Sequence, residues 1–325
     1  MSPALLVTYL ISYGGALIAP FLPFIGVCMY ISLSIIKPTK TWFWAVPDGS
    51  YSKIVIIAVI LGWVIKRFGN WDFGKAKLIV VCFAAFIAWS FMSTLMIDEG
   101  SQERAIDFVV LMLKVLLPFL IVMTLIDSVE KLKMLAWCIV ISLGLVALEE
   151  NLYYLSMGFV RGMIGMNAIA HEMTAGFGLA VFLGLYSEKN WQKWLSWSIA
   201  GLIAHVSFMC MSRGAMLGLL ITGIIIAYKM PKNRQTISLT IFAIFSISIL
   251  AGPSVVQEFS TIFAAESVRD NSAQSRLDLW ADMFTVALSN PLFGIGPSQW
   301  QLIAVQFGWP DGKQGHGMWV QFFAE

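Results

Sequence analysis

Long apolar runs constrain this chain more than any other feature. Clear runs lie at about 52–66, 77–97, 104–126, 132–149, 173–187, 194–211, 214–229 and 236–252. A helix crosses the hydrocarbon core of a membrane with about 20 apolar residues. The runs do not alternate with the period of two that is typical of a transmembrane β-barrel strand. We therefore predict an all-α integral membrane protein with about 10–11 transmembrane helices.

The amino-acid composition agrees with this class. Hydrophobic residues make up 58% of the chain and charged residues only 12%, whereas a soluble domain carries roughly 25% charged residues. The net charge is +2, and no basic stripe with interleaved aromatic residues is present, so we expect no nucleic-acid partner. The four cysteines, Cys28, Cys82, Cys138 and Cys210, each lie inside an apolar run and are expected to be small buried residues.

The order of the runs predicts three regions. Residues 1–252 are expected to form a polytopic helical region, 253–315 one large outer loop, and 316–325 the start of a further transmembrane helix that continues in a longer protein. The first run, 3–36, is broken by Pro20 and Pro23, which predicts two short helices or one kinked helix. It lacks a cationic leader, so no cleaved signal peptide is expected.

Lysine and arginine predict the orientation of the spans, because short cytoplasmic loops carry an excess of both. One set of alternate loops holds eleven cations: Lys66, Arg67, Lys75, Lys77, Lys131, Lys133, Lys189, Lys193, Lys229, Lys232 and Arg234. The opposite set holds six: Arg104, Arg161, Arg213, Arg269, Arg276 and Lys313. The second set is therefore expected on the outer face, where Arg213, the 253–315 loop and the last helix can converge. Lys37, Lys40 and Lys53 would then lie outside too, which leaves the orientation of the first 51 residues open.

The outer loop is expected to contain short amphipathic helices. Ser275 and Asp278 have the spacing of a capping box, which places a helix start there. Apolar residues follow at helical spacing, namely Leu277, Trp280, Phe284, Ala287 and Leu288. Asn290-Pro291 predicts the end of this helix. A turn at 294–297 and a second short helix are expected next, and the first helix would suit a position in the membrane surface.

Two arginines in this region are candidates for binding an anion. Arg213 lies between two apolar runs, so its guanidinium must reach water or an anionic partner. Arg276 is expected in the first helical turn, where the helix dipole disfavours a cation. Each could instead be an ordinary surface residue, Arg213 reaching out to water and Arg276 pairing with Asp278 or Asp282. A guanidinium matches phosphate by two parallel hydrogen bonds, which favours a phosphate ligand.

His316, at the start of the last helix, is the candidate general base, because an imidazole can accept a proton near neutral pH. It could also be no more than a polar residue that begins a helix. Of the other two histidines, His205 is expected to be a hydrogen-bonded packing residue, and His171-Glu172 lacks further ligands at metal-binding spacing. Glu149-Glu150 could face the site or form a solvated helix end. No metal and no cofactor are expected.

The order of these motifs resembles a known family. Ser212-Arg213-Gly214, a long outer loop, Arg276 with Trp280, the 290–296 segment Asn-Pro-Leu-Phe-Gly-Ile-Gly, and Gly315-His316-Gly317 together resemble the O-antigen ligase and polymerase superfamily of bacterial envelope glycosyltransferases. The segments 23–27 and 36–38 are similar to the exosortase A-associated O-glycosylation ligase branch. The resemblance covers most of the chain and is most specific over 207–325.

The resemblance implies a glycosyltransferase of the bacterial inner membrane. Members take a glycan from undecaprenyl-pyrophosphate on the periplasmic face and pass it to a hydroxyl of lipid A core, a glycan or a protein. By motif, Arg213 and Arg276 would hold the pyrophosphate, and His316 would activate or orient the acceptor hydroxyl. The expected partners are therefore this donor, a glycan, lipid or protein acceptor, and membrane lipids.

Two departures from the family pattern bear on this expectation. Gly317 stands where members often have Asn, and His171-Glu172 does not match the expected pattern. A polymerase of the same superfamily is an alternative that the sequence leaves open. A transporter or flippase of lipid-linked glycan is an alternative of another class, although the chain shows no internal repeat and its charged candidates cluster on one face rather than at the midplane.

Overall fold

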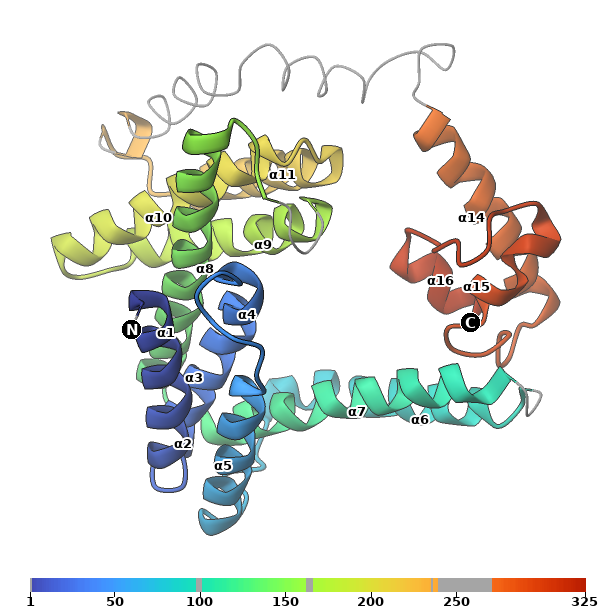
Figure 1. Cartoon of the computed structure of the whole chain (residues 1–325), viewed down its shortest axis with the longest axis horizontal. Coiled ribbons are helices and arrows are strands. Elements are labelled where there is room, and N and C mark those ends of the chain that lie inside the picture. Colours follow the sequence, from blue (N-terminus) through green and yellow to red (C-terminus); the bar gives the residue numbers. More distant parts are fainter. Residues whose placement is uncertain (1, 98–100, 162–165, 235, 239–270) are drawn as a thin grey trace. The chain divides into compact units, whose positions relative to one another are not determined.

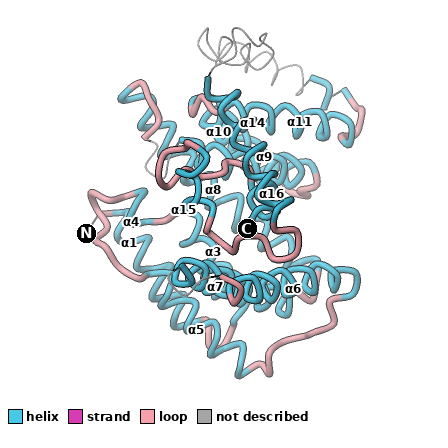
Figure 2. Tube along the Cα trace, turned by 90° about the vertical axis from the view of Figure 1, so that its right-hand side faces the viewer, coloured by secondary structure: helices cyan, strands magenta, loops and turns pink. Residues whose placement is uncertain are grey.

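The computed structural model describes residues 2–97, 101–161, 166–234, 236–238 and 271–325, with the side chains of 271–273 left aside. Every regular element in this part of the chain is a helix (Figure 2). Four of the described helical segments are long and apolar enough to cross a membrane: Gly74–Thr94, Gln102–Leu125, Val129–Met157 and Met166–Leu185. The predicted class, an all-α membrane protein, is confirmed. The number of about 10–11 spans exceeds these four and stays a prediction.

The predicted spans between 52 and 229 each coincide with a helix. They are α5 (Tyr51–Ile65), α6 (Lys77–Thr94), α7 (Gln102–Leu125), α8 (Val129–Met157), α9 (Met166–Leu185), α10 (Asn190–Met209) and α11 (Arg213–Lys229). The predicted span 236–252 lies almost wholly outside the described residues. The first apolar run forms two helical stretches rather than one: α1 (Pro3–Tyr9), η1 (Leu10–Gly14) and α2 (Gly15–Ile18), then α3 (Pro23–Ile36). The short α4 (Pro38–Thr41) follows.

The chain divides into two compact units. Unit 1 comprises residues 1–67 and 126–264, and unit 2 comprises 68–125 and 265–325. The expected boundaries at 252 and 315 stay predictions.

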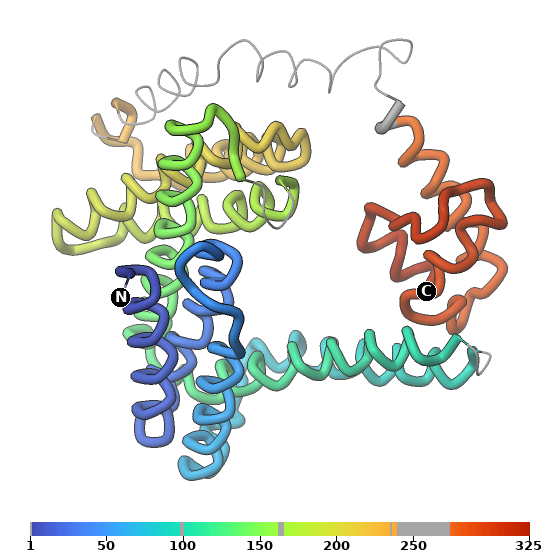
Figure 3. Tube along the Cα trace, in the orientation of Figure 1, coloured from blue at the N-terminus to red at the C-terminus, as the bar shows by residue number. Residues whose placement is uncertain are grey.

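In unit 1, α8 is the central helix: α3 packs against it from the N-terminal part of the unit, and α9 and α10 pack against it from the part that follows α8. Helix α3 packs against α5 and α8, and α9, α10 and α11 lie side by side and run across α8 (Figures 1 and 3). The Cys138 thiol of α8 donates to the Cys28 carbonyl of α3 at 3.0 Å. At the other end of α8, the Asn151 amide donates to the Leu202 carbonyl of α10 at 3.1 Å. These polar contacts between apolar helices fix which faces of the helices meet.

Unit 2 combines the hairpin of α6 and α7 with the C-terminal segment. That segment contains α14 (Asn271–Ser289), α15 (Trp300–Ile303), η5 (Ala304–Phe307) and α16 (Met318–Ala324). Its core consists of buried residues from all of these helices: Leu279, Met283, Val286, Ala287, Trp300, Ala304, Val320 and Ala324. Trp89 of α6 stacks on Phe293 with ring centroids 5.2 Å apart, and the Gln299 amide donates to the Ser101 carbonyl at 3.0 Å. The residues after α14 are thereby attached to α6 and α7.

Two expectations for α14 are corrected by the structure. The helix already contains Asn271, so Ser275 lies inside it and does not cap it, and the Gln274 amide donates to Asp278 at 3.0 Å. Arg276 is therefore beyond the first turn, where the helix dipole would disfavour a cation, so the dipole gives no reason to expect an anionic ligand there. Of the predicted apolar stripe, Ala287 and Trp280 pack in the core with Leu279 and Met283, whereas Leu277, Phe284 and Leu288 are exposed. The position of this helix in the membrane surface stays a prediction. The predicted end of the helix before Asn290-Pro291 is confirmed.

Candidate functional site

Arg213 begins α11 at the sharp turn that follows α10. Met211 has a left-handed backbone, with φ of 50°, and Ser212 is extended and buried. The Met216 amide donates to the Ser212 carbonyl at 2.9 Å, which starts the helix directly after the turn. Arg213 itself is partly exposed. The connection from α10, which ends at Met209, to α11, which begins at Arg213, is thus very short.

Arg276 and His316 belong to the same unit, 40 positions apart in the sequence. Arg276 is an exposed residue of α14, and His316 is an exposed residue of the loop before α16. The pKa of His316 is lowered, first by partial burial and then by the positive charges of Arg276 and Lys313. Unit 2 therefore contains both the predicted base and one predicted phosphate-binding residue, and the charge of Arg276 acts on His316.

Trp280 fixes the loop that presents His316. Its indole N–H donates to the Gly315 carbonyl at 2.8 Å, and its ring lies beside Trp319, with centroids 6.2 Å apart. A side chain at position 317 would place its Cβ 2.9 Å from the indole, so glycine is needed there unless Trp280 moves. The close approach of Trp280 therefore accounts for glycine at position 317, where the family pattern has Asn.

His316 itself has a left-handed backbone, which is uncommon for residues other than glycine, although histidine adopts it more often than most. Its φ is 50°, in the left-handed region, where a residue other than glycine is held only by its surroundings. The hydrogen bond from Trp280 on one side and the start of α16 at Met318 on the other supply this constraint. Such constrained residues cluster at functional sites.

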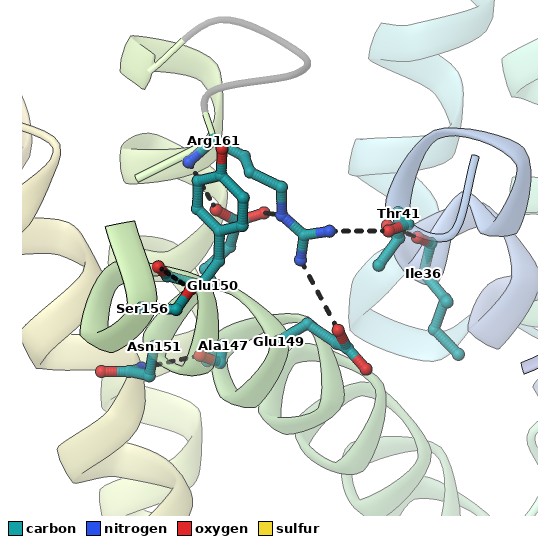
Figure 4. A network of polar contacts seen from close by, with 9 residues as sticks. Ile36, Thr41, Ala147, Glu149, Glu150, Asn151, Ser156 and Arg161 are labelled. Carbon is teal, nitrogen blue, oxygen red and sulfur yellow. Dashed lines mark hydrogen bonds and ion pairs between the residues drawn. The ribbon is translucent and has the colours of Figure 1, made fainter. Parts of the chain in front are cut away.

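A buried ion-pair cluster lies at the end of α8 in unit 1 (Figure 4). The side chain of Arg161 is only 5% exposed, and its guanidinium lies 3.6 Å from Glu149 and 3.5 Å from Glu150. It also donates to the Thr41 carbonyl at 3.1 Å, and its backbone N–H donates to Glu150 at 3.1 Å. The rings of Trp44 and Tyr153 each lie 5.0 Å from the guanidinium carbon. Three distant segments are joined by this one side chain.

Other charged and polar candidates also have partners in unit 1. Glu172 forms an ion pair with Lys37 at 2.9 Å, so the two residues share one face of the unit. His205 lies 2.5 Å from the Asn151 side chain, ring nitrogen to oxygen, and packs on Tyr154. The expectation that His205 is a hydrogen-bonded packing residue is confirmed. Apart from the opposite charges, nothing in the sequence indicated that Arg161 pairs with Glu149 and Glu150.

The predicted site residues are thus divided between the units. Arg276 and His316 lie in unit 2, and Arg213 lies in unit 1. Among the residues that the structure describes, no group of three or more His, Cys, Asp or Glu side chains is arranged to hold a metal ion.

Two family models match the chain. Residues 199–320 match the O-antigen ligase family, and residues 4–158 match a family of unknown function. The match at residues 199–320 supports membership of the O-antigen ligase superfamily. The first range includes Arg213, Arg276 and His316, and the second includes both glutamates of the Arg161 cluster. No curated protein and no solved structure matches the chain.

Proposed function

We propose that this protein transfers a glycan from undecaprenyl-pyrophosphate to an acceptor hydroxyl at the outer face of the bacterial inner membrane. The observation that carries the proposal is that Arg276 and His316 lie in one unit, inside the segment that matches the O-antigen ligase family, with the positive charge of Arg276 acting on His316. A cation that can bind phosphate and a neutral imidazole that can accept a proton suit glycan transfer from a pyrophosphate. The family match supports the general activity of glycan ligation.

In the proposed reaction, the acceptor oxygen attacks the anomeric carbon of the donor glycan. The bond between that carbon and the pyrophosphate oxygen breaks, and its electron pair leaves with the pyrophosphate. His316 takes the proton of the acceptor hydroxyl, for which its lowered pKa keeps it neutral near pH 7. Arg213 and Arg276 stabilise the negative charge that develops on the leaving group. With two guanidiniums in this role, the reaction needs no metal ion.

The test is a transfer assay in membranes that contain the full-length protein, an undecaprenyl-pyrophosphate-linked glycan and candidate acceptors. Arg213→Ala, Arg276→Ala and His316→Ala should each abolish transfer while insertion into the membrane stays normal. Full activity in any one of them removes that residue from the mechanism. The glycan products of a deletion strain separate the alternatives: single repeats indicate a lost polymerase, and long unattached chains indicate a lost ligase.

A further inference from the structure

His171 lies directly against the turn that carries Arg213. If Gly214 had a Cβ, that atom would be 3.0 Å from Cε1 and 3.6 Å from Nε2 of the His171 ring. The imidazole edge therefore packs against the backbone of the residue that follows Arg213. His171 is nevertheless an exposed residue, so the rest of its ring is accessible.

The packing of α9 against α11 holds the His171 imidazole beside Gly214. One turn further along, a Cβ at Gly218 would lie 2.9 Å from Thr174, and the Thr174 hydroxyl faces the Ala215 carbonyl at 3.5 Å. Beyond them, a Cβ at Gly178 would lie 3.1 Å from Thr222. Because the sequence positions increase together on both helices, α9 and α11 run parallel in a single register. A shift of His171 away from Arg213 would require all of these contacts to change.

The surroundings of His171 leave its ring nitrogens available for a ligand. Neither nitrogen bonds to another residue in the described part of the chain, whereas the neighbouring Glu172 is engaged by Lys37 at 2.9 Å. A neutral imidazole retains one N–H donor in either tautomer, and an imidazolium has two. His171 can therefore donate to an anion without first being protonated.

We infer that His171 contacts the donor substrate at the proposed transfer site, where it donates a hydrogen bond to a phosphate oxygen of the lipid-linked pyrophosphate beside Arg213. This inference rests on the proposed function, because it takes Arg213 as a phosphate-binding residue. His171 and Arg213 then form a phosphate-binding pair within unit 1. The role needs a ring or amide N–H, and not a change of protonation state.

The test compares three variants in the transfer assay, with a purified undecaprenyl-pyrophosphate-linked glycan as the varied substrate. His171→Leu should raise the KM for the donor roughly ten- to hundredfold, the usual cost of a lost hydrogen bond to a charged group. The KM for the acceptor should not change. His171→Gln, which keeps an N–H donor of similar reach, should restore the donor KM to within about threefold of wild type.

Thr174→Val is the matched control, because it alters the same α9–α11 contact one turn away and leaves the imidazole in place. It should behave as wild type. An unchanged donor KM in His171→Leu, or a failure of Gln to restore it, overturns the inference. Arg213→Ala in the same assay distinguishes a failure of the proposed role of Arg213 from a failure of the proposed role of His171. If Arg213→Ala is fully active, the proposed role of Arg213 fails. If it is inactive and His171→Leu matches wild type, only the role of His171 fails.

Discussion

The indole of Trp280 donates to the main-chain carbonyl of Gly315 at 2.8 Å, one residue before His316. This bond joins α14, which carries Arg276, to the loop that carries the predicted base. The geometry around the proposed base in unit 2 therefore depends on a residue that has no proposed chemical role of its own.

Trp280→Phe removes this hydrogen bond and keeps an aromatic ring. We expect transfer to fall about two- to tenfold, the usual range for one neutral hydrogen bond, because the His316 loop loses its anchor. The rate of glycan transfer, measured at equal amounts of inserted protein, checks this. Phe284→Leu, on the exposed face of the same helix, is the control and should stay active. Equal rates in Trp280→Phe and wild type would show that the loop is held by other contacts.

Gly317→Ala adds a Cβ that would lie 2.9 Å from the Trp280 indole. The loop or the indole must shift, so transfer should fall. The same substitution should cost less in a Trp280→Phe background, because the smaller ring leaves room. A double-mutant cycle on transfer rates measures this coupling. Additive effects of the two substitutions would argue against the close approach of Trp280 to Gly317.

The pH profile of transfer should reflect the lowered pKa of His316. Since the neutral imidazole accepts the proton, the rate should be constant near pH 7 and fall only as the pH drops through this lowered value. Lys313→Gln removes one of the positive charges that disfavour the imidazolium, so the pKa of His316 should rise and the acid limb should move to higher pH. The rate as a function of pH is the measurement, with Lys193→Gln as the control. An acid limb that moves to lower pH in Lys313→Gln would contradict the assignment.

Arg161→Ala should destabilise unit 1. It leaves Glu149 and the buried Glu150 without their partner, and breaking such a buried pair costs about 3–5 kcal/mol. Arg161→Lys should recover only part of this, because a single ammonium cannot reach both glutamates and the Thr41 carbonyl together. Thermal unfolding of the purified protein in detergent measures the effect. Asp127→Asn removes one partner of the exposed Asp127–Lys131 pair and should change little. Comparable losses in both variants would mean that the Arg161 cluster contributes no more than a surface pair.

The predicted orientation of the spans can be tested with single cysteines. Asp311→Cys lies in the predicted outer loop and Glu188→Cys in the turn between α9 and α10, and both positions are exposed. In cells with a permeabilised outer membrane, an impermeant maleimide should label Asp311→Cys at once. Glu188→Cys should react only after lysis. The reverse pattern would invert the orientation and place the transfer site in the cytoplasm.

The helices were predictable because each apolar run is bounded by charged or turn residues that also end the helix. The run 104–126, for example, became α7 at Gln102–Leu125. The start of α14 was not predictable, because the spacing of Ser275 and Asp278 that suggests a cap also occurs inside helices. The face that it buries in the core was not predictable either. Both faces of α14 carry apolar residues, and only the packing of Trp300 and Val320 selects Leu279 and Met283 for the core.

The site was predictable in its residues but not in its contacts. Arg276 and His316 were visible as polar residues in an apolar protein, yet the segments that carry them are joined by the Trp280–Gly315 bond across 35 positions. The bond between Arg161 and the Thr41 carbonyl spans 120 positions and involves a backbone atom, which no side-chain pattern reveals. The sequence was used only to reject His171 as a metal ligand. That His171 lies beside Gly214 is visible only in the packing of α9 against α11.

The most direct test of the proposed transferase is a comparison of wild type with His316→Ala. Membranes with each full-length protein would receive an undecaprenyl-pyrophosphate-linked glycan and candidate acceptors in the presence of EDTA. We predict transfer by the wild type and none by His316→Ala, with equal insertion of both proteins. Equal transfer by the two proteins, or loss of wild-type transfer in EDTA that added metal restores, would contradict a metal-independent transferase with His316 at its acceptor side.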